Sequence, residues 1–254
     1  NLDLPLWQQY LKYVGDLLQG DFGPSFRVRD FTVAELIVSG FPASLQVGGM
    51  AILLAIVIGI SLGSFAALRQ NTAADYAVMG VAMTGIAVPN FVMAPLLTLV
   101  FGVYLSLLPV AGWGDGSFAN KVLPVIALAL PQIAYIARLT RGSMVEVMNA
   151  NYVRTARAKG LRERLVVVRH SLKGALLPVV SYLGPATAAV ITGSVVIESI
   201  FGIPGIGRYF IEGALNRDYT LVMGVMVFYA VLIILLNLVV DLLYAVLDPK
   251  VRYV

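Results

Sequence analysis

The residue types that carry most enzyme chemistry are scarce in this sequence and are not spaced as a catalytic site requires. The chain has no Cys and a single His, His170, so it lacks a thiolate nucleophile and the material for a zinc site. A phosphate-binding loop needs Gly-Lys-Ser or Gly-Lys-Thr, and no lysine of this chain follows a Gly. Paired intramembrane aspartates, a His-Glu-x-x-His helix and a credible pairing of Ser with His are also missing. The sequence therefore predicts a chain that is not an enzyme, holds no metal and hydrolyses no nucleotide itself.

Positive charge is the chemically distinctive feature, and half of it falls in one segment. Residues 138–173 hold nine of the 18 Lys and Arg residues, against two acidic residues, Glu146 and Glu163. Short cytoplasmic loops of membrane proteins retain Lys and Arg, so fixation of the membrane topology would by itself explain this charge. A nucleic-acid site is not indicated, because the segment lacks an interleaved aromatic platform.

The pattern within this segment indicates two short helices separated by Gly160. In the first helix apolar residues share one face and arginines lie on another, and a second amphipathic run covers 162–172. Two short helices hinged at a glycine beneath a membrane would form a docking element for a cytosolic partner. The apolar residues of the first helix are Tyr152, Ala156 and Leu161, and its arginines are Arg154 and Arg157.

The composition requires a membrane around most of the chain. Hydrophobic residues make up 59% of the 254 residues and charged residues 13%, about half of the roughly 25% found in soluble domains. Five intervals without charged residues mark candidate membrane helices of about 20 residues, and the shortest, 122–137, is lengthened if Arg138 extends toward the interface. The sequence therefore predicts an all-α polytopic membrane protein. Its spans are expected at about 43–68, 76–108, 120–138, 174–198 and 220–247, the second as one long helix kinked near Val88-Pro89-Asn90.

The distribution of basic residues predicts the orientation of these spans. One side of the membrane receives 12 Lys and Arg residues and the other receives 6, so the C-terminus is expected inside and the N-terminus outside. A chain that starts outside is expected to lack an upstream helix, and Asn1 is expected to begin a fragment. The domains follow from this: an external segment 1–40 with short interfacial helices, a transmembrane domain 41–247 containing a cytoplasmic loop 139–173, and a cytoplasmic tail 248–254. Trp7, Tyr10 and Tyr13 are expected to anchor the external segment at the outer interface.

Small and acidic residues in the spans limit the mechanism. Gly59 and Gly63 are spaced for a close helix approach. Span 174–198 is the least bulky part of the chain, which favours packing over the lining of a pathway. No acidic residue is expected at mid-membrane, where proton- or sodium-coupled carriers commonly need ionisable groups, and Asp241, the one candidate, is expected near the inner interface. Energy for any transport is therefore expected from another subunit.

The segment Tyr152 to Leu161 resembles a known loop. Its sequence, Tyr-Val-Arg-Thr-Ala-Arg-Ala-Lys-Gly-Leu, is similar to the peptide-permease form of the Glu-Ala-Ala loop in membrane subunits of bacterial ABC importers. Ala156 matches the second Ala of that pattern, Gly160 its Gly, and Leu172 the Leu of its closing Ile-x-Leu-Pro. The Glu, first Ala, Ile and Pro of the pattern are replaced here by Arg154, Thr155, His170 and Lys173.

Further motifs extend the resemblance over nearly the whole chain. Gly-Asp-Phe-Gly-Pro-Ser-Phe at 20–26, Ile-Pro-Gly-Ile-Gly at 203–207 and the segments 82–85, 215–219 and 241–250 are similar to the OppB-type oligopeptide permease family. The resemblance implies a type I ABC importer transmembrane fold of six spans, five of them present here. It also implies a multi-pass protein of the bacterial inner membrane, in contact with membrane lipid.

The same resemblance implies partners and a site. The partners are a second, OppC-like permease subunit, two ATPase subunits (OppD- and OppF-like) and an external, OppA-like peptide-binding protein. ATP and Mg are expected in the ATPase subunits, with no cofactor in this chain. The loop is expected to couple ATP hydrolysis to alternating access and import of oligopeptides, and no residue of the substrate pathway is assigned. The coupling residues implied are Asn151, Tyr152, Arg154, Thr155, Ala156, Arg157, Lys159, Gly160 and Leu161.

Other functions remain open at this point. The same architecture could import dipeptides, glutathione or nickel complexes. An ATP-independent carrier or channel would need intramembrane ionisable groups that the sequence does not suggest. A membrane anchor or assembly protein would use the basic loop for docking alone.

Overall fold

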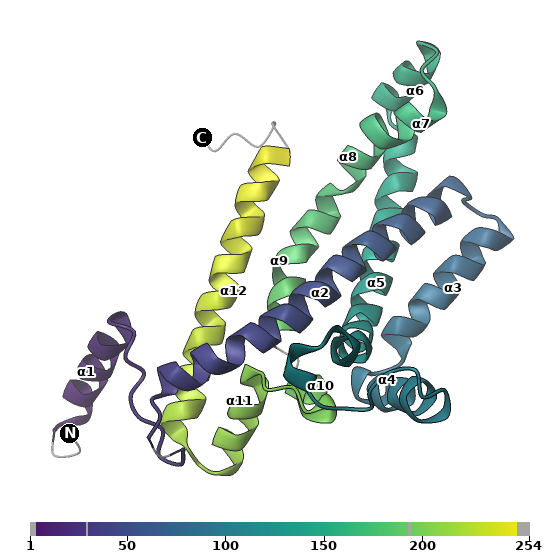
Figure 1. Cartoon of the computed structure of the whole chain (residues 1–254). Coiled ribbons are helices and arrows are strands. Elements are labelled where there is room, and N and C mark those ends of the chain that lie inside the picture. Colours follow the sequence, from purple (N-terminus) through teal and green to yellow (C-terminus); the bar gives the residue numbers. More distant parts are fainter. Residues whose placement is uncertain (1–3, 29, 193–194, 248–254) are drawn as a thin grey trace.

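The computed structural model describes residues 4–28, 30–192 and 195–247, and these residues are almost entirely helical (Figure 1). In this part of the chain the only β contact is an isolated bridge between Pro24 and Thr32. Three helices are long and apolar enough to cross a membrane: α2 (Val33–Leu68), α5 (Phe118–Met148) and α12 (Tyr219–Leu247). The predicted all-α polytopic fold is confirmed. The predicted tail, 248–254, lies outside the described residues.

Two further candidate spans are broken helices. The first consists of α3 (Ala73–Ala87), α4 (Asn90–Leu97) and the π-helix η1 (Thr98–Tyr104), with a bend of 104° at the break. The expectation of one kinked helix is therefore corrected to two separate helices. The chain breaks at the predicted place because the residue before a proline is pushed out of the helical region, and Val88 is extended with ψ 117°.

The second broken span joins the basic segment to a membrane helix. It runs through α7 (Glu163–Leu165), η3 (Val166–Ser171) and α8 (Leu172–Ala175), then bends by 50° into α9 (Leu177–Thr192). The predicted span 174–198 does not form one helix. Its last residues belong to α10 (Val195–Phe201), and α11 (Ile206–Leu215) follows before α12.

Helix ends differ from the predicted spans where polar residues extend a helix beyond the apolar stretch. α2 begins at Val33, about ten residues before the predicted start, because Thr32 and Glu35 form a reciprocal cap. The Glu35 backbone N donates to Thr32 Oγ1 at 3.2 Å, and the Thr32 backbone N donates to Glu35 Oε2 at 2.8 Å. α5 continues to Met148, so the first ten residues of the predicted loop 139–173 belong to a membrane helix.

The core forms where α2 lies along α5. Gly59 and Gly63 are buried in this contact, and a Cβ atom on Gly59 would lie 2.8 Å from Ile136 Cβ. The two glycines therefore permit the close approach that their spacing predicts. Apolar residues of α9 and α10 pack against the same cluster, including Val179, Val190 and Phe201.

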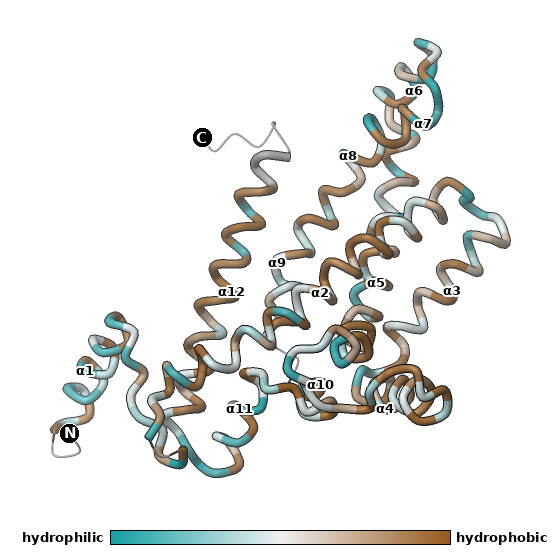
Figure 2. Tube along the Cα trace, in the orientation of Figure 1, coloured by the Kyte–Doolittle hydropathy of each residue, from teal (hydrophilic) through white to brown (hydrophobic). Residues whose placement is uncertain are grey.

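The polar parts of the chain gather at the two ends of the helices. We call the end that carries α6 (Asn151–Ala158), α7, the α2–α3 connection and the last turn of α12 the basic end (Figure 1). The opposite end carries α4, α10 and α11. Figure 2 shows hydrophilic residues concentrated at the tip formed by α6 and α7, while α12 is hydrophobic over most of its length. Helix α1 (Leu6–Leu18) has no buried residue and stands apart from the other helices in the view of Figure 1.

Asp218 fixes the opposite end where α11 turns into α12. Its carboxylate accepts hydrogen bonds from Ser25 Oγ at 2.5 Å, Thr220 Oγ1 at 3.1 Å and the Leu221 backbone N at 3.1 Å. The carboxylate thus caps α12 and holds the segment before α2 against it. Burial raises the pKa of Asp218, but hydrogen bonds from Ser25, Leu221, Phe26 and Thr220 lower it by more, so the net shift is downward.

This shift predicts a pH-dependent contribution to stability. A carboxylate with a lowered pKa stabilises the fold above its unfolded pKa of about 3.9, and the contribution is lost as the pH falls through the folded value. We expect Asp218→Asn to lower the thermal midpoint of the detergent-solubilised protein at pH 6, and the deficit against the wild type to shrink at pH 3. An equal deficit at both pH values would show that the charge of Asp218 contributes nothing.

Candidate coupling site at the basic end

Helix α6 sits on a small apolar base. Val153 and Ala156 are buried on its inner face and pack with Val166 of η3 and Val147 of α5. Only Asn149 and Ala150 separate α6 from the end of α5. The helix is therefore held against two membrane-linked elements, and its outer face remains exposed.

The inner face differs in part from the one predicted. Ala156 is buried as expected, but Tyr152 is 50% exposed and Leu161 is 36% exposed, and Val153 takes the inner position instead. Helical spacing explains this, because residues three apart share a face. Tyr152 leans across the start of α8, where a Cβ atom on Gly174 would lie 3.0 Å from the Tyr152 Oη.

Gly160 ends the first helix by its backbone conformation. Its φ is +75°, a left-handed value that costs a residue with a Cβ atom about 1 kcal/mol or more. Its backbone N donates to the Arg157 carbonyl at 2.9 Å, which closes the last turn of α6. Nothing lies within 4 Å of a Cβ atom built there, so conformation and not space requires glycine at this position.

Arg157 and Glu163 join α6 to α7 across this turn. Arg157 Nη2 lies 2.7 Å from Glu163 Oε1, and Arg157 Nε lies 3.2 Å from Glu163 Oε2. The pairing raises the pKa of Arg157. Both side chains are exposed, so the bridge contributes little stability, and its effect is to orient the two helices. The sequence alone gave no role to Glu163.

The remaining predicted residues form the outer face of α6. Asn151, Arg154, Thr155 and Lys159 are exposed, and Thr155 Oγ1 donates to the Asn151 carbonyl at 2.9 Å. Within the described part of the chain, Arg154 and Lys159 have no carboxylate partner. The outer face of α6 thus presents two available cations on a rigid base, which suits a partner with acidic or hydrogen-bond-accepting groups.

A buried ion pair ties this base to the membrane helices. Arg141 of α5 and Asp75 of α3 form two parallel bonds of 2.6 Å, Nε to Oδ1 and Nη2 to Oδ2. Asp75 is fully buried, and its Oδ2 also accepts from the Asn71 backbone N at 2.9 Å. Sequence reasoning missed Asp75, although its position three residues after an N-cap threonine, Thr72, is a recognisable helix start. The pair links α3 to α5, the helix that leads into α6.

A second buried carboxylate lies at the opposite end. Glu198 of α10 is 2% exposed and accepts from Ser44 Oγ at 2.6 Å and from the Gly207 backbone N at 2.8 Å. The Ile206 backbone N donates to Ser44 Oγ at 3.0 Å, so the glycine-rich turn before α11 wraps around the carboxylate. A Cβ atom on Gly207 would lie 2.7 Å from Glu198 Oε2. Glu198 is the last residue of the predicted span 174–198, and the sequence alone gave it no role.

Comparisons with known proteins connect this arrangement to a family. A profile of the family described as "Binding-protein-dependent transport system inner membrane component" matches residues 59–253. The oligopeptide transport system permease protein OppB of Salmonella typhimurium is 54% identical over 253 residues, which is 100% of this chain and 83% of that protein. The chain belongs to this family of inner membrane transport components. The resemblance to OppB-type permeases is confirmed.

Other relatives and solved structures agree with this assignment. OppB of Haemophilus influenzae is 49% identical over 100% of this chain and 83% of its own length. The dipeptide transport system permease protein DppB of Bacillus subtilis is 47% identical over 99% of this chain and 81% of its own length. A structure of the MetNI methionine ABC transporter in an inward-facing conformation matches with a TM-score of 0.71 over 84% of this chain and 96% of that chain. At 16% identity this match establishes the fold alone.

Family membership settles several expectations. The permease is a multi-pass protein of the bacterial inner membrane and a component of a transport system that depends on a binding protein. It is a transport component and not a catalytic subunit, as its OppB relatives are permease proteins. The coupling role of α6 is not tested by these comparisons and remains a proposal.

The buried pair of Asp75 and Arg141 gives a stability prediction for this permease. Asp75→Asn leaves Arg141, whose side chain is 28% exposed, without its charge partner and replaces a fully buried carboxylate. We expect the thermal midpoint in detergent to fall by about 2 °C or more. The matched control is Asp241→Asn, which removes an exposed aspartate of α12 and should change the midpoint little. Equal midpoints for the two variants would contradict a clamp between α3 and α5.

Proposed function

We propose that this chain is a membrane-spanning permease subunit of an ATP-driven importer of oligopeptides. The observation that carries the proposal is its 54% identity, over the full length of this chain, to a protein named as an oligopeptide transport permease. The exposed basic face of α6 supports an energy source outside this chain, because it offers a docking surface fixed to the membrane helices. In the described residues no group of three or more His, Asp and Glu side chains is placed to hold a metal ion.

The proposed complex contains four kinds of partner. A second, OppC-like permease completes the membrane part, and two ATPase subunits, OppD- and OppF-like, bind ATP and Mg on the inner side. An OppA-like binding protein delivers peptide on the outer side. The basic end faces the cytosol in this arrangement, since it carries most of the basic residues. The segment 1–40 and the loop 201–219 face the binding protein.

The geometry supports a mechanical route for energy coupling. ATP brings the two ATPase subunits together, and their motion displaces α6, which seats on one of them as a rigid knob. Because α6 follows α5 after two residues, and Asp75 joins α5 to α3, the membrane helices move as one unit. The pathway then changes from inward-facing to outward-facing, peptide enters, and hydrolysis resets the complex. This is alternating access driven by the different affinities of ATP for two states, with no chemical change to the peptide.

Dipeptides are the second candidate substrate. DppB of Bacillus subtilis is 47% identical to this chain, which is close to the identity of the OppB relatives. ATP-dependent uptake into proteoliposomes that contain the full complex tests both candidates. Import of labelled tri- to pentapeptides supports the proposal, import of dipeptides alone favours the second candidate, and import of neither overturns both.

The coupling role is tested by reversing charge on the outer face of α6. Arg154→Glu should lower ATP-driven uptake and the stimulation of ATP hydrolysis by peptide-loaded binding protein by about tenfold or more, because a charged contact at an interface is lost. Val153 and Ala156 remain as the base, so the membrane part should fold normally. The matched control is Arg69→Glu, the same charge change on an exposed residue at the end of α2, outside α6.

Three outcomes of this experiment are informative. A loss confined to Arg154→Glu supports coupling through α6. Wild-type uptake by both variants overturns the coupling role. An equal loss in both variants also overturns it, because the effect would then follow net charge and not the position of the side chain.

A further inference from the structure

A row of polar side chains crosses from α5 to α9. Gln132 and Tyr135 of α5 and Tyr182 of α9 meet there: the Tyr182 hydroxyl donates to Gln132 Oε1 at 2.7 Å, and the two tyrosine ring centres lie 5.7 Å apart. Arg138 stands over the Tyr135 ring, with its Cζ 5.3 Å from the ring centre. We call Gln132, Tyr135, Arg138, Ser181 and Tyr182 the polar strip.

The strip lies on a surface that the described residues leave uncovered. Arg138 and Ser181 are exposed, and Gln132, Tyr135 and Tyr182 are partly exposed. On α9 the exposed positions recur at helical spacing, whereas the positions that face the core are buried. These exposed positions of α9 are Pro178, Ser181, Pro185 and Ala189.

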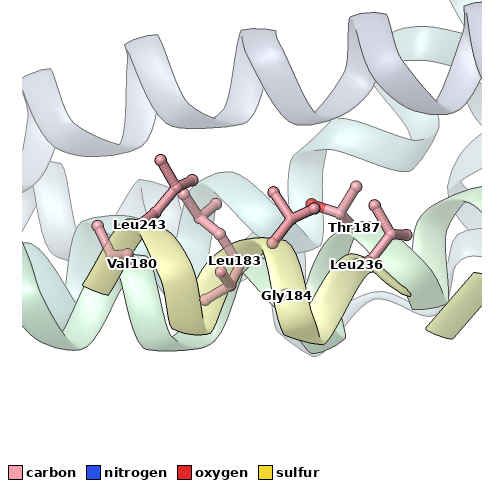
Figure 3. A pocket seen from close by; sticks show the side chains of 8 residues that line it. Val180, Leu183, Gly184, Thr187, Leu236 and Leu243 are labelled. Atoms are coloured by element: carbon pink, nitrogen blue, oxygen red, sulfur yellow. The ribbon is translucent and has the colours of Figure 1, made fainter. Parts of the chain in front are cut away.

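The exposed side chains in the middle of α12 are apolar. On α12, Ile234 is 66% exposed and Leu238 is 51% exposed. Between α9 and α12 lies a groove of about 370 Å³, and Figure 3 shows the side chains that line it. It is lined by Val180, Leu183, Gly184, Thr187, Leu236, Val239, Val240 and Leu243, a set that suits lipid acyl chains.

The difference in polarity between the polar strip and the surface of α12 indicates what each of them faces. Polar groups in hydrocarbon without hydrogen-bond partners are costly, and ionisable residues in membrane spans almost always face a bundle interior or a water-filled cavity. Arg138 has no carboxylate partner within the described part of the chain. A lipid surface therefore does not fit the polar strip, although it fits α12 and the groove.

We infer that the polar strip lines the peptide pathway and that Arg138 binds the carboxylate of the passing peptide. This inference rests on the function proposed above. Gln132 and Arg138 are six residues apart on α5, which corresponds to about 9 Å along the helix. About three residues of an extended peptide at roughly 3.3 Å each match that length. The amide of Gln132 and the tyrosine hydroxyls can exchange hydrogen bonds with the peptide backbone.

The chemistry of the strip fits a substrate recognised by its main chain. A guanidinium forms two parallel bonds with a carboxylate, and every unmodified peptide has one at its C-terminus. The strip holds no carboxylate that would repel this group. The polar strip does not select the side chains of the peptide. A preference for particular peptide sequences would therefore come from another subunit.

Thiol labelling tests whether the strip is in contact with water. The chain contains no cysteine, so each introduced thiol on it is unique. In the full complex, Ser181→Cys should react with a charged, water-soluble maleimide, and a labelled tripeptide supplied with its binding protein and ATP should slow the reaction severalfold. Ile234→Cys, on the apolar face of α12, should remain unlabelled until the complex is denatured.

This labelling does not depend on successful transport. If Ser181→Cys stays unlabelled with and without ATP but reacts after denaturation, the strip is covered by the second permease and the inference is overturned. If the wild-type complex imports no peptide while Ser181→Cys reacts, the proposed function fails, and the strip still contacts water.

A substitution at Arg138 tests the carboxylate contact. We expect Arg138→Gln to lower the uptake rate of a tripeptide with a free C-terminus about tenfold relative to the wild type. The same tripeptide with a C-terminal amide should be affected much less, and Arg138→Lys should retain part of the preference for the free form. An equal loss for both peptides would show a structural role and overturn the assignment.

Discussion

Hydrocarbon supplies no hydrogen bonds, and this constraint determines where each polar group of the chain can lie within the membrane. Two buried carboxylates find their hydrogen-bond partners within the protein. Asp75 pairs with Arg141 and the Asn71 backbone, and Glu198 pairs with Ser44 and the turn before α11. Each pairing joins elements that are far apart in the sequence. The groups that are costly to bury are therefore also the ones that fix how the helices are held together at the two ends.

Helix α6 is held in place by packing against neighbouring elements. A basic segment of the same composition could serve as a flexible tether, but α6 rests on Val153, Ala156 and Val166, and Gly160 sets the angle to α7. Removal of any one exposed cation leaves that base in place. The proposed docking surface and the packing surface thus belong to different faces of one short helix, so substitutions on the docking face would leave the fold in place.

Hydropathy and charge predicted the apolar stretches of α2, α5 and α12, and Pro89 marked the break between α3 and α4. The spacing of Gly59 and Gly63 predicted a close helix approach but did not identify α5 as the partner. Hydropathy and charge failed where polar residues continue a helix, as at the Thr32 and Glu35 cap and in the extension of α5 to Met148, because a charge count ends a span at the first ionised group. Glu198 and Asp75 were missed for a different reason. Their partners, Ser44 and Arg141, lie 154 and 66 residues away, and pairing at that distance leaves no local pattern.

The polar strip shows why composition could not distinguish packing from a pathway in α9. The helix uses its small residues for both: Gly184 is buried against α12, where a Cβ atom would lie 2.8 Å from Asn237 Oδ1, while Ser181 and Pro185 are exposed. The face of α9 with Gly184 packs closely against α12, and the opposite face is not constrained by that packing. The exposed face of α9 is polar because of its neighbours on α5, which are Gln132, Tyr135 and Arg138. An uncovered guanidinium next to two tyrosines requires water or a polar ligand. A pathway placed there would be bounded by α5 and α9, the two membrane helices that connect directly to the elements around α6. A displacement at the basic end would therefore reach the walls of the pathway without passing through the apolar surface of α12.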